Sequence, residues 1–244
     1  MKIAMIGTGY VGLVSGVCFS DFGHDVVCVD KDPAKIAKLN AGSVPIFEPG
    51  LEALMVKNVE AGRLRFTLDM ADAVQGADAV FIAVGTPTRR GDGHADLSYV
   101  NAAAEDVARA ATDYVVIVTK STVPVGTNRH LKQLIRKANP ALEFDVASNP
   151  EFLREGAAIE DFMKPDRVVV GVQSDRAAEV MAGMIVRLGA SRMSSVLGLK
   201  VAPSTVTVLP LKLPPHRSSS LSIIRRLISS LTLMTVSVIC IGIE

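Results

Sequence analysis

The stretch Met1-Lys-Ile-Ala-Met-Ile-Gly-Thr-Gly-Tyr-Val-Gly12 opens the chain and predicts its fold. Ile3 to Ile6 is a short apolar run typical of a buried strand, and Gly7, Gly9 and Gly12 follow it with the spacing of a dinucleotide-binding turn. The first glycine allows a tight turn, the second lets the backbone approach a pyrophosphate, and the third lets the next helix pack on the strand. We expect that helix to present its free N–H groups and positive dipole end to phosphates.

A second predicted strand, Asp25 to Val29, ends at the acidic residue Asp30. A carboxylate at this point can accept hydrogen bonds from both hydroxyls of the adenosine ribose and would repel a 2′-phosphate. Glycines also occur in ordinary turns, but a strand, a helix and an acid in this order favour a cofactor site. The sequence therefore predicts NAD binding, with NAD preferred over NADP.

Charge divides the 244-residue chain into two unlike parts, although the net charge of +1 suggests no nucleic-acid partner. Residues 1–179 carry 24 acidic and 19 basic side chains, whereas residues 180–244 carry 1 and 7. No aromatic residue follows Phe162. We therefore predict an NAD-binding domain over residues 1–186 and a tail of another kind over residues 187–244.

The three cysteines, Cys18, Cys28 and Cys240, lack the spacing of metal ligands, so no metal site is predicted. Cys18 falls on the apolar face of the first helix and Cys28 lies inside the second strand, as small core residues do. Cysteines used as small core residues favour a reducing compartment, and Met1 to Ile6 is too short for a signal-peptide core. These features predict a cytoplasmic protein.

Apolar strands alternate with helical patterns along residues 1–183. This alternation predicts an α/β fold, a Rossmann-like doubly wound parallel sheet. Strands are expected at 3–6, 25–29, 65–67, 77–84, 114–119, 144–147 and 167–172, and helices at 32–42, 51–62, 70–75, 97–111, 128–137 and from 174, besides the one after the glycines.

Polar side chains gather where these strands end. In a parallel sheet the loops after the strand carboxyl ends line the ligand crevice. This places Thr86 beside the cofactor and brings the hydroxyl pair of Ser121 and Thr122 to the same edge, with Glu151 and Glu155 nearby. The carboxylates could hold a water or accept a proton, or belong to a structural hydrogen-bond network.

Six motifs, in this order, resemble the nucleotide-sugar dehydrogenase family, and within it the UDP-glucose 6-dehydrogenases. The resemblance covers about residues 1–183, and its most specific element is the fifth motif. The motifs are GTGYVG at 7–12, FEPGL at 47–51, GTPT at 85–88, KSTVPVGT at 120–127, NPEFLREG at 149–156 and KPDRVVVG at 164–171.

The resemblance implies an NAD-dependent oxidation of the C6 alcohol of UDP-glucose to a carboxylate, giving UDP-glucuronate for polysaccharide synthesis. Two hydrides leave, and the second step of the family passes through a cysteine thioester that water hydrolyses. The resemblance also implies which residues bind. NAD would contact Gly7, Gly9 and Gly12 together with Val11, Asp30, Lys35, Thr86, Thr122 and Glu155. The sugar nucleotide would contact Glu151, Phe152, Leu153, Arg154 and Glu155. Thr122 and Glu151 would hold the catalytic water.

The sequence also departs from the family, whose members have a central helix with a lysine and an asparagine, a cysteine motif, a dimer-forming helix and a UDP-binding domain. None of these appears here, and Cys240 in VICIG lacks the flanking residues of the nucleophile. The chain is therefore predicted to bind NAD without completing the oxidation. Two alternatives stay open: part of a GDP-mannose or UDP-N-acetyl-hexosamine 6-dehydrogenase, and a non-catalytic NAD-binding module.

The tail from Arg187 to Glu244 has no clear helical or strand period. The likeness stops where the composition changes, which suggests a shifted reading frame, and sequencing the coding DNA would test this. A rival interpretation is a membrane anchor over Leu227 to Ile243, whose seventeen uncharged residues fall short of the roughly 20 that span a bilayer. A disordered or poorly folded tail is the prediction, with no membrane partner.

Overall fold

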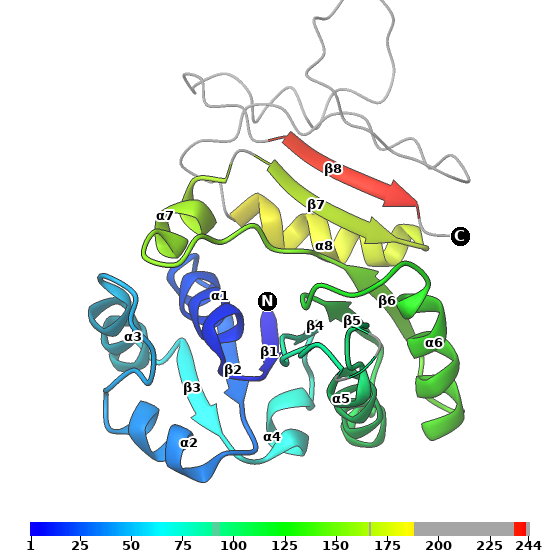
Figure 1. Cartoon of the computed structure of the whole chain (residues 1–244), viewed down its shortest axis with the longest axis horizontal. Helices are drawn as coiled ribbons and strands as arrows, with labels where there is room; N and C mark the ends of the chain where they lie inside the picture. Colours follow the sequence, from blue (N-terminus) through cyan, green and yellow to red (C-terminus); the bar gives the residue numbers. More distant parts are fainter. Residues whose placement is uncertain (90, 92, 166, 188–236, 243–244) are drawn as a thin grey trace, which may run out of the picture.

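A single sheet of eight strands forms the centre of the molecule (Figure 1) in the computed structural model, which describes residues 1–89, 91, 93–165, 167–187 and 237–242. The strand order is β3-β2-β1-β4-β5-β6-β7-β8. The strands are β1 (Lys2–Ile6), β2 (Asp25–Val29), β3 (Leu64–Thr67), β4 (Ala79–Ile82), β5 (Val115–Thr119), β6 (Phe144–Ser148), β7 (Arg167–Val172) and β8 (Ser237–Gly242).

Helices cover both faces of this sheet, because its central strands are apolar on both sides. In β1, Ile3 and Met5 join the core beneath α1, whereas Ala4 and Ile6 join the core beneath α5. Residues of α1, α2, α3, α7 and α8 belong to the first core, and residues of α4, α5 and α6 to the second. The helices are α1 (Tyr10–Asp21), α2 (Pro33–Asn40), α3 (Leu51–Glu60), α4 (Met70–Val74), α5 (Ser98–Ala110), α6 (Thr127–Ala138), α7 (Ala158–Met163) and α8 (Asp175–Arg187).

The strand order reverses between β1 and β4, which places a crevice at their carboxyl ends. Strands β1 to β6 are parallel, so the predicted doubly wound Rossmann-like sheet is confirmed there. All loops that carry the predicted site residues leave the sheet at this one edge.

The prediction of an all-parallel sheet is wrong for β7, which pairs antiparallel with β6 through Ser148 and Gly171. The connection between them contains only the short helix α7, which packs beside α1. A parallel return needs a crossover that brings the chain back to the amino edge. The short connection through α7 is instead followed by a strand that runs in the opposite direction to β6.

Most of the predicted tail, residues 188–236 and 243–244, lies outside the described residues, and so does most of the proposed anchor. Residues Ser237–Gly242 form β8, which pairs parallel with β7 at the edge of the sheet. None of the described helices has the length and apolar character needed to cross a bilayer.

Candidate functional site

The glycine turn, residues 7–12, is packed so closely that two of its glycines have no room for a side chain. Gly7 has φ +101°, a left-handed value that favours glycine, and its N–H donates to the Val29 carbonyl at 2.7 Å. A methyl group on Gly12 would lie 2.0 Å from the Gly7 carbonyl oxygen. At Gly9, the N-cap of α1, a methyl group would meet nothing within 4 Å. The turn therefore leaves open space in front of a helix N-terminus that no side chain caps.

Asp30 lies directly beside this turn. Its Oδ2 accepts from the backbone N–H of Thr8 at 2.9 Å and from the Thr8 hydroxyl at 2.6 Å, and its Oδ1 accepts from Asp32 N–H at 3.0 Å. The Lys35 ammonium lies 3.6 Å from Oδ2. Burial raises the pKa of Asp30, but the hydrogen bonds from Thr8 and Asp32 and the charge of Lys35 outweigh it and hold the pKa below its usual value. The carboxylate is thus ionised and oriented where an adenosine ribose would follow the pyrophosphate.

These two features fit the cofactor that the sequence predicts. A space that a Cβ at Gly9 would fill, a free helix N-terminus and a fixed carboxylate are the three parts of a dinucleotide site. Val11 is half-buried in the first turn of α1. Among the described residues, no group of three or more His, Cys, Asp or Glu is arranged to hold a metal ion.

The loops after β4 and β5 are joined by side chains of the predicted site. The Thr86 hydroxyl donates to the Thr122 carbonyl at 3.4 Å, and the Ser121 hydroxyl donates to the Val84 carbonyl at 2.6 Å. The hydroxyls of Ser121 and Thr122 therefore have different surroundings, although the two residues are neighbours in the sequence. Ser121 binds the backbone and fixes the two loops together, while Thr122 is exposed at the crevice edge.

The loop after β6, residues 149–156, is held to the sheet at its start. Asn149 N–H donates to the Thr119 carbonyl at 2.9 Å, and the Glu151 carboxylate accepts from Leu153 N–H at 2.6 Å. Phe152 is 61% exposed, and Glu155 is exposed as well. Glu151 thus sits on a fixed base, while the middle of the loop faces solvent.

Arg154 belongs to the same loop, and its guanidinium pairs with Asp161 of α7 at 2.6 Å. The backbone N–H of Arg154 donates to the same carboxylate at 2.9 Å. The structure therefore gives Arg154 a partner within the protein, which the sequence reasoning did not foresee.

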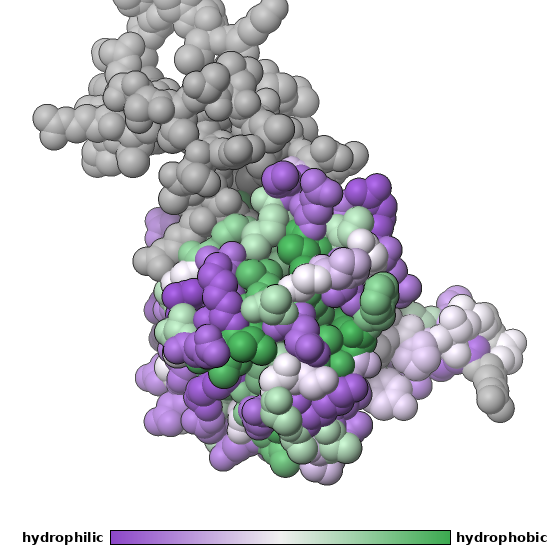
Figure 2. All heavy atoms as spheres, turned by 90° about the vertical axis from the view of Figure 1, so that its left-hand side faces the viewer, coloured by the Kyte–Doolittle hydropathy of each residue, from purple (hydrophilic) through white to green (hydrophobic). Residues whose placement is uncertain are grey.

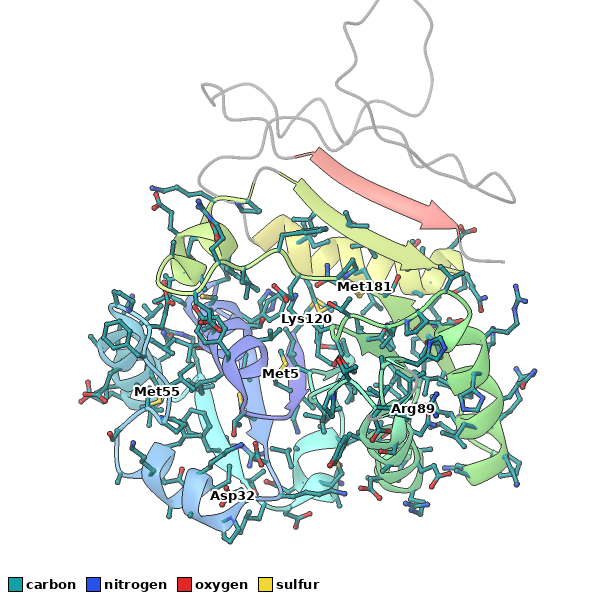
Figure 3. All side chains as sticks on the ribbon, viewed as in Figure 1. Met5, Asp32, Met55, Arg89, Lys120 and Met181 are labelled. Atoms are coloured by element: carbon teal, nitrogen blue, oxygen red, sulfur yellow. The ribbon has the colours of Figure 1, made fainter. Side chains whose placement is uncertain are left out.

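A cavity of about 70 Å³ lies between this loop and α8. Glu151, Phe152 and Leu153 line it together with apolar side chains that include Phe162 and Met181. Figure 3 shows Lys120 next to Met181 at the centre of the molecule. The predicted substrate residues therefore border a pocket that is mostly apolar and contains one ammonium group.

Lys120 is 3% exposed, and its Nζ donates to Asn149 Oδ1 at 3.0 Å and lies 5.5 Å from the centre of the Phe162 ring. Burial lowers the pKa of Lys120 to about 8, although the nearby Glu151 carboxylate raises it. In the pH range just above 8 the folded chain thus holds this lysine largely neutral.

We predict a specific pH dependence of stability from Lys120. Between pH 8 and 10 the unfolded chain keeps a proton on this lysine that the folded chain has lost, so Lys120 alone contributes a rise in the free energy of unfolding of up to about 1.4 kcal/mol per pH unit. Above about pH 9, Cys18 and Cys28 contribute in the opposite sense, because burial raises the pKa of each thiol to about 12. Lys120→Met should remove this rise, and Lys38→Met, a change at an exposed lysine, should keep it. Urea unfolding at several pH values measures the slopes, and equal slopes in Lys120→Met and the parent chain would contradict the assignment.

Four side chains at this edge were missed by sequence reasoning, although all lie in the quoted motifs. Lys120, which follows β5, donates a hydrogen bond to Asn149, which follows β6. Tyr10 donates one to Glu48 beside the 149–156 loop. The available signal was their position inside the motifs that carry the resemblance. Their pairing across long sequence distances could not be read from the chain.

The predicted site residues thus form three groups at one edge of the sheet. The glycine turn lies with Asp30 and Lys35, Thr86 lies with Thr122, and the 149–156 loop lies beside Lys120. The last group also reaches the first, because Gly156 N–H donates to the Tyr10 hydroxyl at 3.2 Å.

Comparison with known proteins agrees with this geometry. The NAD-binding domain of the UDP-glucose/GDP-mannose dehydrogenase family matches residues 1–187. The UDP-glucose 6-dehydrogenase of Rhizobium meliloti (strain 1021) is 65% identical over 183 residues, a match that covers 74% of this chain and 42% of that protein. The chain therefore spans about two fifths of the length of this relative.

Two solved structures share the fold. A UDP-glucose dehydrogenase from the hyperthermophilic archaeon Pyrobaculum islandicum matches with a TM-score of 0.73 and 44% identity, over 76% of this chain and 44% of that one. A GDP-mannose dehydrogenase from Pseudomonas aeruginosa, solved as a ternary complex, matches with a TM-score of 0.73 and 36% identity. This match covers 76% of this chain and 44% of that one.

Proposed function

Because the chain belongs to the UDP-glucose/GDP-mannose dehydrogenase family and contains its NAD-binding domain, we propose that it supplies the cofactor half of an NAD-dependent oxidation of UDP-glucose to UDP-glucuronate. The observation that carries this proposal is the fixed carboxylate of Asp30 beside the open N-terminus of α1. The 65% identity to a UDP-glucose 6-dehydrogenase supports UDP-glucose as the sugar nucleotide.

The proposed site assigns each part of the cofactor to a part of the chain. Gly7, Gly9, Val11 and Gly12 would surround the pyrophosphate, and Asp30 with Lys35 would bind the adenosine ribose. The exposed residues Thr86, Thr122 and Glu155 would border the nicotinamide end. Bound NAD would supply the hydride acceptor, and the chain's own groups would orient the alcohol and receive its proton.

The substrate would lie against Glu151, Phe152, Leu153, Arg154 and Glu155. Converting the C6 alcohol to a carboxylate removes two hydrides and three protons and adds one water, so the site must hold a water as well as the sugar. We assign that water to Thr122 and Glu151, because a hydroxyl and a carboxylate can orient it and accept a proton. The position of Glu151 on the fixed start of its loop supports this role.

A second substrate has some support. The structure of the GDP-mannose dehydrogenase from Pseudomonas aeruginosa matches this chain with the same TM-score as the archaeal UDP-glucose dehydrogenase. Its sequence identity to this chain is lower, 36% against 44%. Thermal melting with UDP-glucose, GDP-mannose and UDP-N-acetylglucosamine separates these substrates, since only a ligand that binds the folded state raises the melting temperature.

We further propose that residues 1–186 are the NAD-binding unit and that residues 187–244 take no part in the cofactor site. The end of the family match at residue 187 supports this boundary. We also place the protein in the cytoplasm, where its unpaired Cys18 and Cys28 would remain reduced.

We predict that the chain binds NAD but does not turn over UDP-glucose. Burial raises the pKa of both Cys18 and Cys28 to about 12, so neither thiol can form the nucleophilic thiolate near neutral pH. Calorimetric titration should detect NAD binding and a weaker binding of NADP. When NAD and UDP-glucose are both added, the absorbance of NADH should stay at background, because no thiol is available as the nucleophile. Absence of NAD binding would refute the cofactor site. Steady NADH production would refute the predicted inactivity, and its loss in Cys240→Ser would identify Cys240 as the nucleophile.

A further inference from the structure

Glu48 is a buried carboxylate that joins two distant parts of the chain. It lies in the connection between α2 and α3 and is 6% exposed. Its Oε2 accepts from Gly156 N–H at 2.8 Å, and its Oε1 accepts from Ala158 N–H at 2.9 Å. Because Ala158 begins α7, Glu48 satisfies backbone groups at both the end of the 149–156 loop and the start of that helix.

The third partner of Glu48 is the hydroxyl of Tyr10, the first residue of α1. This hydroxyl donates to Glu48 Oε2 and accepts from Gly156 N–H at 3.2 Å. Burial and the hydrogen bond to Glu48 raise the pKa of Tyr10 to about 12, and the hydrogen bonds to Glu48 hold the pKa of that carboxyl below its usual value against the effect of burial. Near neutral pH the pair therefore remains a hydroxyl donor and an ionised acceptor, which is a strong combination.

Tyr10 is thus connected to both halves of the proposed site. Its backbone follows Gly9, the residue at the open end of α1, while its ring reaches the loop proposed to bind the sugar nucleotide. Figure 1 shows α7 beside α1. The middle of the loop is open, since the Phe152 side chain is 61% exposed. Phe47, which precedes Glu48 in the sequence, is 87% exposed. Figure 2 shows apolar patches between hydrophilic ones on the side of the molecule that carries α3.

We propose that the Tyr10–Glu48 pair couples the two ligand sites, so that NAD bound at the glycine turn orders the 149–156 loop for the sugar nucleotide. The inference rests on the proposed NAD site. A ligand that fixes the first turn of α1 also fixes Tyr10, and Tyr10 with Glu48 holds the N–H groups of Gly156 and Ala158. Tyr10 and Glu48 are positioning residues in this scheme, and linkage requires the sugar nucleotide to favour NAD binding by the same factor.

Hydrogen exchange of the full chain tests the coupling without any catalytic assay. With saturating NAD, exchange of the Gly156 and Ala158 N–H groups should slow by about fivefold or more, the factor expected at the lower end of known couplings. In Tyr10→Phe, which removes only the hydroxyl, NAD should leave these two rates nearly unchanged. A purely structural role would change the rates of the free protein and keep their response to NAD.

Tyr114→Phe is the matched control, because Tyr114 also donates to a carboxylate, that of Asp145 at 2.9 Å, away from the glycine turn. It should keep the full response to NAD, and Glu48→Gln, which keeps an acceptor but loses the charge, should show a reduced one. If NAD binds and Tyr10→Phe responds like the parent chain, the coupling is refuted and the NAD site stands. If NAD does not bind the parent chain, the proposed function fails and the coupling fails with it.

Discussion

Asp30→Ala should weaken NAD binding by about 10- to 150-fold, which corresponds to losing one hydrogen bond of about 1.5–3 kcal/mol to a charged group. The carboxylate is held in place by the backbone and hydroxyl of Thr8, so it does not need to be ordered when a ribose arrives. The same change should bring the affinities for NAD and NADP close together, because the charge that repels a 2′-phosphate is gone. Calorimetric titrations with both cofactors measure the two effects.

Asp30→Ala also leaves Thr8 N–H without its acceptor, so part of any loss could come from a less stable turn. Asp30→Asn separates the two causes, since its amide oxygen can still accept from Thr8 but carries no charge. We expect it to lose less stability than Asp30→Ala, because only the acceptor for Asp32 N–H and the ion pair with Lys35 are lost, and still to lose the preference for NAD. Asp72→Asn, at an exposed ion pair with Arg65, is the matched control and should bind NAD normally. A folded Asp30→Ala protein with unchanged affinity would place the ribose elsewhere.

The cofactor site could be predicted from sequence because its parts are local. A strand, three glycines, a helix and an acid at the end of the next strand lie within thirty residues, and a parallel pairing of the two strands brings Asp30 to the same edge as Gly9. The structure adds the detail that Thr8 orients the carboxylate. The parallel order of β1 to β6 followed from the same alternation of elements.

The remaining features depend on contacts between distant segments. The antiparallel strand β7 follows a connection whose short helix, α7, was not predicted, because six residues give no clear helical period. Ser121 and Thr122 are equivalent in sequence, and only their positions relative to the Val84 carbonyl separate a structural hydroxyl from an exposed one. The burial of Glu48 likewise depends on Gly156, more than a hundred residues further on.

Gly9 and Gly12 should give opposite results when each is changed to alanine. A methyl group on Gly12 would lie 2.0 Å from the Gly7 carbonyl oxygen and 3.2 Å from the Ala83 side chain, so the backbone must move. Overpacking of this kind costs about 3 kcal/mol or more, which lowers the melting temperature of a chain of this size by about 6–12 °C. Gly9 has φ −69°, which alanine adopts readily, and open space around it, so Gly9→Ala should melt within about 2 °C of the parent chain.

The difference between these two variants tests what the open space is for. If a pyrophosphate lies against the N-terminus of α1, the methyl group of Gly9→Ala occupies part of its volume, and the NAD affinity should fall at least about tenfold with no loss of stability. The main effect of Gly12→Ala should be a loss of stability. Its affinity for NAD should fall only to the extent that the turn is distorted. A Gly9→Ala protein that binds NAD as tightly as the parent chain would show that the phosphates do not lie there. A Gly12→Ala protein that melts normally would show that the turn is less closely packed than the 2.0 Å approach requires.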